Sequence, residues 1–207
     1  MLKTDNNPLL DFSGLPRFSD IRSEHVRPAL DQVLAELREQ REKLFGNVSE
    51  FSWDSFVLPM EEMDEMLHRM WSPVSHLNAV MNNETLRAAY NECLPLLSEY
   101  GTELAQDERV YSAYRQVAER VDFANLPAAQ QKIVNNALRD FRLAGAELND
   151  ADKKKFKQNQ TRLAELTSKF SENVLDATNA WELVLTDKQQ LTGLTDFAIN
   201  MARQSAE

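Results

Sequence analysis

The side chains best suited to chemistry in this 207-residue sequence are three histidines and one cysteine. A zinc peptidase of the His-Glu-x-x-His type needs two histidines four residues apart on one helix face, with the glutamate acting as the base. The residues that follow His25, His68 and His76 are valine, arginine and leucine, so this motif is absent from the sequence. The sequence therefore supplies no zinc centre of this kind.

Two weaker motifs lie in the middle of the chain. Glu65 and His68 have the Glu-x-x-His spacing of di-iron helical bundles, but such a site needs a second copy of the motif, and the sequence has none. Residues 72–78 hold two serines with His76 and Asn78, without the nearby carboxylate or the glycine elbow of a serine hydrolase. We interpret 72–78 as a proline-broken helix junction in which the His and Asn side chains satisfy local backbone groups.

The single cysteine excludes a disulfide framework and a cysteine-based zinc site. Cys93 stands among leucines, which favours a buried thiol that packs as a small apolar residue. A reactive thiolate needs a cationic setting or a helix N-terminus, and neither is visible around this position.

Charge limits the classes of partner. Twenty-three Lys and Arg against 33 Asp and Glu give a net charge of -10, which argues against nucleic acid or an anionic membrane, because both require clustered positive charge. No apolar run is long enough to span a membrane, and the first residues carry no secretory signal. We therefore expect a cytoplasmic protein with no membrane partner.

Two stretches have charge of one sign. Six acidic residues and no basic one lie between Asn47 and Leu67, and five basic residues with one acidic residue lie between Asp152 and Arg162. The simpler interpretation is two solvated helix faces, since exposed ion pairs contribute only about 0–1 kcal/mol each. The alternative is a pair of docking patches for a partner or for the termini of peptides.

Methionine and tryptophan are concentrated between residues 53 and 81. Methionine side chains repack easily, so a cluster of them can form either an ordinary core or a groove that accepts varied peptides. Met66 departs from the helical stripe of its neighbours, which favours a groove for at least part of the cluster. The stripe itself consists of Met60, Met63, Leu67 and Met70.

Almost every segment has apolar residues at helical spacing, and strand signals are nearly absent, so the sequence predicts an all-α fold of antiparallel helical bundles or hairpins. The longest pattern predicts a helix over 150–178 that pairs with the helix before it. Brief alternation over 181–185 favours a short extended segment. Pro73 is expected to end one helix and begin another. Predicted helix caps are Ser23, Ser52, Asn83, Asp107, Asp187 (or Thr186) and Thr195.

Three regions are expected along the chain. Residues 1–22 form a loop that packs through apolar anchors, and 23–185 form the helical domain. Residues 186–207 begin a further helical segment, which stops without glycine, proline or an apolar closing residue. We expect either a segment of a longer protein or a frayed natural terminus. The loop anchors are Leu9, Leu10, Phe12, Leu15 and Phe18.

Distinctive short segments occur in order along nearly the whole chain. The opening holds three of them, at 7–10, 15–18 and 24–30. The later ones are Ser72-Pro-Val-Ser-His-Leu-Asn78, Leu94-Pro-Leu-Leu-Ser-Glu-Tyr100, Asn136-Ala-Leu-Arg-Asp-Phe141 and Phe170-Ser-Glu-Asn-Val-Leu-Asp-Ala-Thr178. The opening segments resemble the thimet oligopeptidase family of zinc metallopeptidases, and the later ones resemble its bacterial oligopeptidase A branch.

The resemblance implies a much longer, mostly helical parent enzyme, in which two halves flank a deep channel that admits only short unstructured peptides. It implies that zinc in the parent polarises the scissile carbonyl while a glutamate takes a proton from the bound water. The family's zinc ligands and this glutamate lie in the later part of such proteins, and no position of this sequence matches them. The resemblance thus implies a segment without catalytic residues or a cofactor of its own.

Within that interpretation the segment forms part of a channel wall, and its partners are the remainder of the parent peptidase and short peptides. The residues expected to face the channel are Met66, His68, Trp71, His76 and Asn78. The alternative is a stand-alone helical module that binds peptides or proteins without catalysis.

Overall fold

The structure is a computed structural model that describes residues 7–206 of the chain. Within these residues the regular structure is helical and contains no strand, which confirms the all-α prediction. The chain divides into two compact units, Met1–Ser168 and Lys169–Glu207. Helix α6 (Asp150–Ala180) begins in the first unit and ends in the second.

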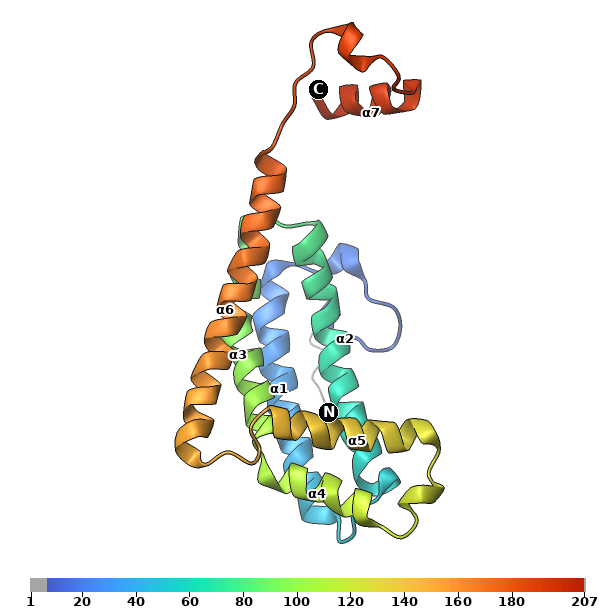
Figure 1. The fold of residues 1–207 in the computed structure, drawn as a ribbon, viewed down its shortest axis with the longest axis vertical. Coiled ribbons are helices and arrows are strands. Elements are labelled where there is room, and N and C mark those ends of the chain that lie inside the picture. Colours follow the sequence, from blue (N-terminus) through green and yellow to red (C-terminus); the bar gives the residue numbers. More distant parts are fainter. Residues whose placement is uncertain (1–6, 207) are drawn as a thin grey trace. The chain divides into compact units, whose positions relative to one another are not determined.

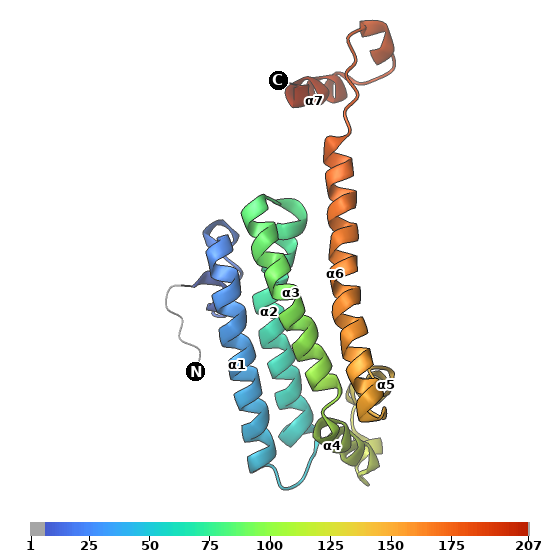
Figure 2. The same ribbon diagram turned by 90° about the vertical axis from the view of Figure 1, so that its left-hand side faces the viewer.

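Three long helices make up most of the first unit: α1 (Ser23–Asn47), α2 (Leu58–Val80) and α3 (Glu84–Ala105). They lie side by side and successive helices run in opposite directions (Figures 1 and 2). The shorter helices α4 (Glu108–Glu119) and α5 (Ala128–Leu143) lie across one end of this bundle. The predicted antiparallel bundle is therefore present.

Helix α1 forms because its apolar residues recur on one face, and that face is buried. Full burial of each such side chain contributes roughly 1.5–3 kcal/mol. The predicted cap at Ser23 is wrong, because Ser23 is the first helical residue and Arg22 occupies the cap position. The backbone N–H of Arg22 donates a hydrogen bond to Nδ1 of His25 at 3.0 Å. The buried residues of the stripe are Val26, Ala29, Leu30, Val33, Leu34 and Leu37.

The predicted break at Pro73 is wrong, because α2 continues through it from Leu58 to Val80. A proline inside a helix removes one backbone hydrogen bond and crowds the preceding turn. Met70 and Val74, on either side of Pro73, are completely buried, as is the proline ring in large part. Burial on this face offsets the lost hydrogen bond, so the helix persists.

A short turn of a different helical type precedes α2. Ser52 caps it by accepting a hydrogen bond from the backbone N–H of Ser55 at 3.1 Å. Residues Trp53–Val57 then form a π-helical turn that runs directly into α2, and Pro59 falls in the first turn of that helix.

Aromatic rings close the end of the bundle beneath α4. Phe56 is fully buried, and its ring lies 5.1 Å from Phe51 and 5.2 Å from Tyr114, both in edge-to-face contact. Phe45 at the end of α1 adds a further contact with Phe51. These rings attach α4 to α1 and to the π-helical turn.

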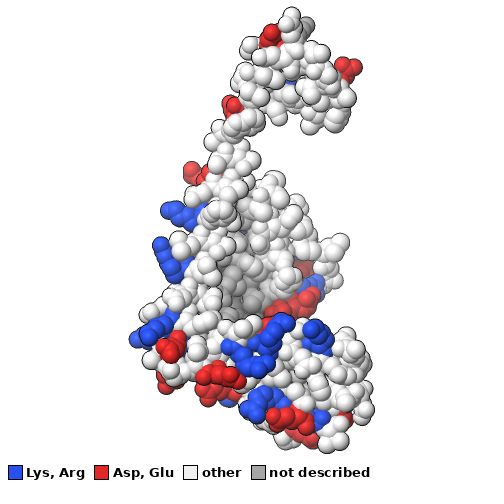
Figure 3. Space-filling view, in the orientation of Figure 1, with Lys and Arg blue, Asp and Glu red and all other residues white. Residues whose placement is uncertain are grey.

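Charged side chains tie α1 to its neighbours along its polar edge. Arg38 and Arg41 both donate to the carboxylate of Glu103 in α3, with distances of 2.9 and 2.7 Å. Arg109 in α4 pairs with Glu42 at 2.7 Å. Figure 3 shows acidic and basic side chains intermixed at the end of the unit formed by α4 and α5.

The chain turns sharply after α5 at Gly145, whose φ of +91° is a backbone conformation that glycine adopts without strain. The first part of α6 then runs antiparallel to α3. Lys157 pairs with Glu99 at 2.6 Å, and Ser168 donates to Asn91 at 3.0 Å. An antiparallel neighbour was expected for α6, but it is α3 rather than the preceding helix α5, which lies across the bundle (Figure 1).

The second unit holds the end of α6, a 3-10 turn (Lys188–Leu191) and α7 (Asp196–Ala206). Asp187 and Thr195 cap the last two elements, as predicted. Residues 181–187 lack regular structure, and no strand forms in this described segment. Alternation of apolar residues alone does not make a strand where no second strand is available for pairing.

Candidate functional site

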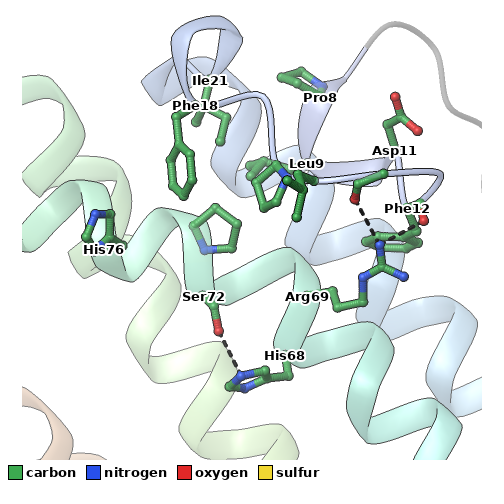
Figure 4. Close-up of a pocket in the computed structure, with 14 residues that line it drawn as sticks. Pro8, Leu9, Asp11, Phe12, Phe18, Ile21, His68, Arg69, Ser72 and His76 are labelled. Carbon is green, nitrogen blue, oxygen red and sulfur yellow. Dashed lines mark hydrogen bonds between the residues drawn. The ribbon is translucent and has the colours of Figure 1, made fainter.

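A pocket of about 350 Å³ lies in the first unit, between the N-terminal segment and one face of α2 (Figure 4). Most of its wall is apolar, and a few polar groups from α2 face it, which is the usual composition of a small-ligand site. The residues from the N-terminal segment are Pro8, Leu9, Asp11, Phe12, Gly14, Leu15, Pro16, Phe18 and Ile21. Those from α2 are His68, Arg69, Ser72, Pro73 and His76.

Asn7 fixes the start of the N-terminal segment. Its side-chain oxygen accepts a hydrogen bond from the N–H of Leu9 at 3.0 Å, which caps a 3-10 turn (Pro8–Leu10). Its side-chain amide donates to the carbonyl of His25 in α1 at 2.9 Å. Leu9 and Leu10 are buried in the core, so this part of the segment is held firmly.

Two of the other predicted loop anchors are exposed to solvent, unlike Leu9 and Leu10. Leu15 is 91% exposed and Phe18 is 43% exposed, and both lie on the wall of the pocket. The ring of Phe18 is in edge-to-face contact with His76 at 5.6 Å (Figure 4). The expectation that Leu15 packs into the domain is wrong, because it belongs to a loop that extends past the bundle.

Arg69 of α2 holds this loop through hydrogen bonds to its backbone carbonyls. Its Nη2 donates to the carbonyls of Phe12 and Gly14 at 2.8 and 3.2 Å, and its guanidinium carbon lies 5.4 Å from the Phe12 ring centroid. No carboxylate within residues 7–206 forms an ion pair with Arg69. The sequence interpretation missed this residue, since nothing local to Arg69 indicates that a distant loop will fold over it.

Asp11 is the one acidic residue on the pocket wall in the described part of the chain. The hydroxyl and the backbone N–H of Ser13 both donate to its carboxylate, at 2.6 and 3.1 Å. These hydrogen bonds, together with the charge of Arg17, lower the pKa of Asp11, so it is ionised at neutral pH. Its charge is offset by Arg17 at 3.4 Å.

The five residues predicted to face a channel lie in separate places. His68 and His76 line the pocket just described, and the imidazole Nε2 of His68 is 3.1 Å from the hydroxyl of Ser72. Met66 instead lines a second groove, of about 460 Å³, between α1 and α2. The structure therefore brings only the two histidines to one pocket.

The remaining two predicted residues contact α3 and the end of α2. Trp71 stacks on Tyr90 of α3 with ring centroids 5.0 Å apart. Asn78 accepts a hydrogen bond from the side chain of Asn82 at 2.8 Å, and Asn82 accepts one from Arg87. The interpretation of residues 72–78 as a helix junction is wrong, because α2 runs through them without a break. Asn78 takes part in a network of side-chain hydrogen bonds at the end of this helix.

Cys93 is completely buried in α3, in agreement with the prediction that it packs as a small apolar residue. Burial raises the pKa of its thiol to about 11, so the thiol stays protonated at neutral pH. It is therefore not a candidate nucleophile.

The basic run at the start of α6 pairs with acids of α3 and α4. Lys153 lies 2.7 Å from Glu108, and Lys157 lies 2.6 Å from Glu99. These contacts use part of the run for packing within the first unit, which weakens its interpretation as a free docking patch.

Comparison with known proteins gives the family. Residues 30–153 match the family model described as Neurolysin/Thimet oligopeptidase, N-terminal domain. The chain belongs to this oligopeptidase family. The matched region covers α2 to α5, the part of α1 from residue 30 onward and the first residues of α6, all within the first unit.

Individual members of the oligopeptidase family are similar along almost all of the chain. Oligopeptidase A of Haemophilus influenzae is 44% identical over 98% of this chain, and that of Escherichia coli is 43% identical over 97%. The probable cytosolic oligopeptidase A of Arabidopsis thaliana is 34% identical over 97% of the chain. The chain spans about 30% of the length of these curated relatives.

The zinc that the family resemblance implies does not fit the residues of this chain. His-Glu-x-x-His is missing from the sequence. Among the residues that the structure describes, no group of three or more His, Cys, Asp or Glu side chains is placed to hold a metal ion. Within residues 7–206, no helix is long and apolar enough to cross a membrane.

Proposed function

We propose that this chain is the N-terminal, channel-wall domain of a zinc-dependent oligopeptidase that hydrolyses short peptides in the cytoplasm, and that it is not catalytic by itself. The observation that carries this proposal is the similarity to oligopeptidase A along 97–98% of the chain, against 30% of the relatives' length. The remaining length of such a polypeptide has room for the zinc ligands that this sequence lacks.

The surface of the first unit supports a role as a wall. Leu163 and Leu166 on α6 are 57% and 48% exposed, and Leu143 at the end of α5 is more exposed still. A domain that functions alone rarely leaves neighbouring large apolar residues so open. We propose that the remainder of the parent peptidase covers part of this surface and that short peptides pass along another part of the domain.

Zinc, in this proposal, is bound by residues outside the 207-residue sequence, so the domain contributes shape and contacts rather than metal chemistry. The cytoplasmic setting is supported by the plant relative whose name describes it as a probable cytosolic oligopeptidase A. A fractionation experiment with an antibody against this domain tests it directly.

The alternative function is a stand-alone helical module that binds peptides or proteins. It is favoured by the pocket under the N-terminal segment, which forms entirely within the first unit. The coding sequence discriminates between the two functions. We expect the natural reading frame to continue past residue 207 into His-Glu-x-x-His, whereas a stop codon at that point would leave only the binding module.

A further inference from the structure

The pocket between the N-terminal segment and α2 has an apolar end and a cationic end (Figure 4). We propose that it binds the C-terminal residue of a short peptide, with an apolar side chain held at the Phe18 end and the terminal carboxylate held by Arg69. The choice of a peptide as the ligand rests on the proposed function, while the chemistry of the site rests on the pocket alone.

The charge of Arg69 carries the argument for a carboxylate. The two loop carbonyls that it contacts are neutral, and both of those bonds use Nη2. No acidic side chain in the described residues pairs with it, and Asp11, the acid on the same wall, is occupied by Ser13 and Arg17. A guanidinium without a carboxylate partner beside an apolar cavity favours an anionic ligand, since charge-assisted hydrogen bonds to a carboxylate are among the strongest in proteins.

Histidine and serine side chains add polar contacts along the floor. His68 and Ser72 form a hydrogen-bonded pair next to Arg69 on α2. A peptide backbone that enters beside them would find both donors and acceptors, whichever ring nitrogen of His68 carries the proton. A purely apolar ligand would use none of these groups.

The opposite end of the pocket accounts for the apolar side chain. The ring of Phe18 contacts that of His76, and the buried side chains of Pro73 and Ile21 also line the pocket. Leu15 stands at the rim with nearly all of its surface in water. A ligand side chain placed here would cover apolar surface that the loop itself leaves open.

Size sets the limit on the ligand. A cavity of about 350 Å³ is near the lower end of ligand pockets, which run from about 300 to 1,000 Å³. It therefore suits one residue with its carboxylate rather than an extended peptide, and the preceding residues would leave through the open side of the loop.

The test compares two probes that differ only in charge. The 207-residue chain is titrated with N-acetyl-L-phenylalanine and with N-acetyl-L-phenylalanine amide, and binding is followed through backbone amide resonances. We expect the acid to shift resonances of residues 8–21 and 68–76, and to bind about tenfold more tightly than the amide, which corresponds to the loss of one charge-assisted hydrogen bond.

Three variants separate charge from loop structure. In Arg69→Gln the preference for the acid over the amide should fall to about one. Loosening of the loop would weaken both probes and leave their ratio unchanged, so the ratio identifies the role of the charge. Phe18→Ala, which leaves the contacts of Arg69 in place, should weaken both probes equally. Arg115→Gln, at an exposed arginine on α4, is the matched control and should change neither.

Equal affinity for acid and amide in the unaltered chain, shifts centred outside the pocket, or no binding of either probe would overturn the proposal. None of these results bears on whether a longer polypeptide hydrolyses peptides, because the titration measures no catalysis. An inactive longer polypeptide would equally leave the measured acid preference intact, so the two proposals fail separately.

Discussion

Arg41 of α1 donates a 2.7 Å hydrogen bond from Nη2 to Oε1 of Glu103 in α3, and its side chain is only 5% exposed. The other two nitrogens of its guanidinium group, Nε and Nη1, are buried without a hydrogen-bond partner. Asp107 lies 3.7 Å from Nε, beyond hydrogen-bond range, and the guanidinium also lies over the ring of Tyr100. This buried cation thus has one hydrogen-bonded carboxylate, Glu103, and a longer ion pair with Asp107.

The first prediction contrasts the two partners. Glu103→Ala removes the main counter-charge of a buried arginine and should lower the free energy of unfolding by about 3 kcal/mol. Arg41→Met removes the buried unpaired donors and leaves Glu103 with Arg38, so it should cost less than about 1 kcal/mol. Urea denaturation followed by circular dichroism measures both. Equal losses of unfolding free energy in the two variants would contradict this prediction, because they would show that the unpaired nitrogens of Arg41 do not destabilise the fold.

The second prediction concerns acid. Burial raises the pKa of Glu103, but the hydrogen bonds and charges of Arg38 and Arg41 outweigh it and hold the pKa below its ordinary value of 4.5. A carboxyl with a lowered pKa in the folded state adds stability that is present above the unfolded pKa and is lost as pH falls through the folded one. The free energy of unfolding should therefore drop below about pH 5. The drop should be shallower in Glu103→Gln, and parallel curves would contradict it.

The third prediction concerns two glycines. Gly145 has a φ of +91°, and a Cβ there would lie 2.7 Å from a methyl carbon of Leu148. Gly145→Ala should cost about 1–2 kcal/mol of stability. Gly101 lies inside α3 with open space around it, so Gly101→Ala should add about 0.5–1 kcal/mol. Thermal unfolding of the two variants should shift in opposite directions, and a shift in the same direction would disagree with the fold.

The fourth prediction concerns association. If the proposed peptidase remainder normally covers Leu163 and Leu166, the isolated chain should self-associate as its concentration rises. Leu163→Glu with Leu166→Glu should reduce the apparent mass in light scattering, whereas Lys154→Gln, at an exposed position of the same helix, should not. A monomer at high concentration before any substitution would count against the covered surface.

Local patterns in the sequence were sufficient for most helices. The caps Asn83 and Asp107 each accept a backbone hydrogen bond at 3.0 Å, as predicted from residue type and position. Helix caps depend on neighbours in sequence, which is why they could be predicted without the fold.

The arrangement of the helices could not be predicted in the same way. Pro73 indicated a break, but burial of Met70 and Val74 keeps α2 intact. The predicted channel residues share one helix pattern, yet Trp71 contacts α3 while His76 contacts the N-terminal loop. Which side of α2 meets which neighbour depends on contacts between residues far apart in sequence, and amphipathic spacing does not specify these.

Arg69 and Glu103 illustrate the same limit for charged residues. In the sequence both belong to ordinary charged helix faces. In the fold one contacts carbonyls 55 and 57 residues away, and the other pairs with arginines 62 and 65 residues away. A single sequence does not contain the pairing that gives either residue its role.

The most direct test of the central claim is hydrolysis of a short fluorogenic peptide by the 207-residue chain and by the polypeptide encoded by the complete reading frame. The account predicts no cleavage by the 207-residue chain, with or without added zinc. It also predicts chelator-sensitive cleavage by the longer polypeptide, restored by zinc. Chelator-sensitive cleavage by the 207-residue chain, or a longer polypeptide that remains inactive with zinc, would contradict it.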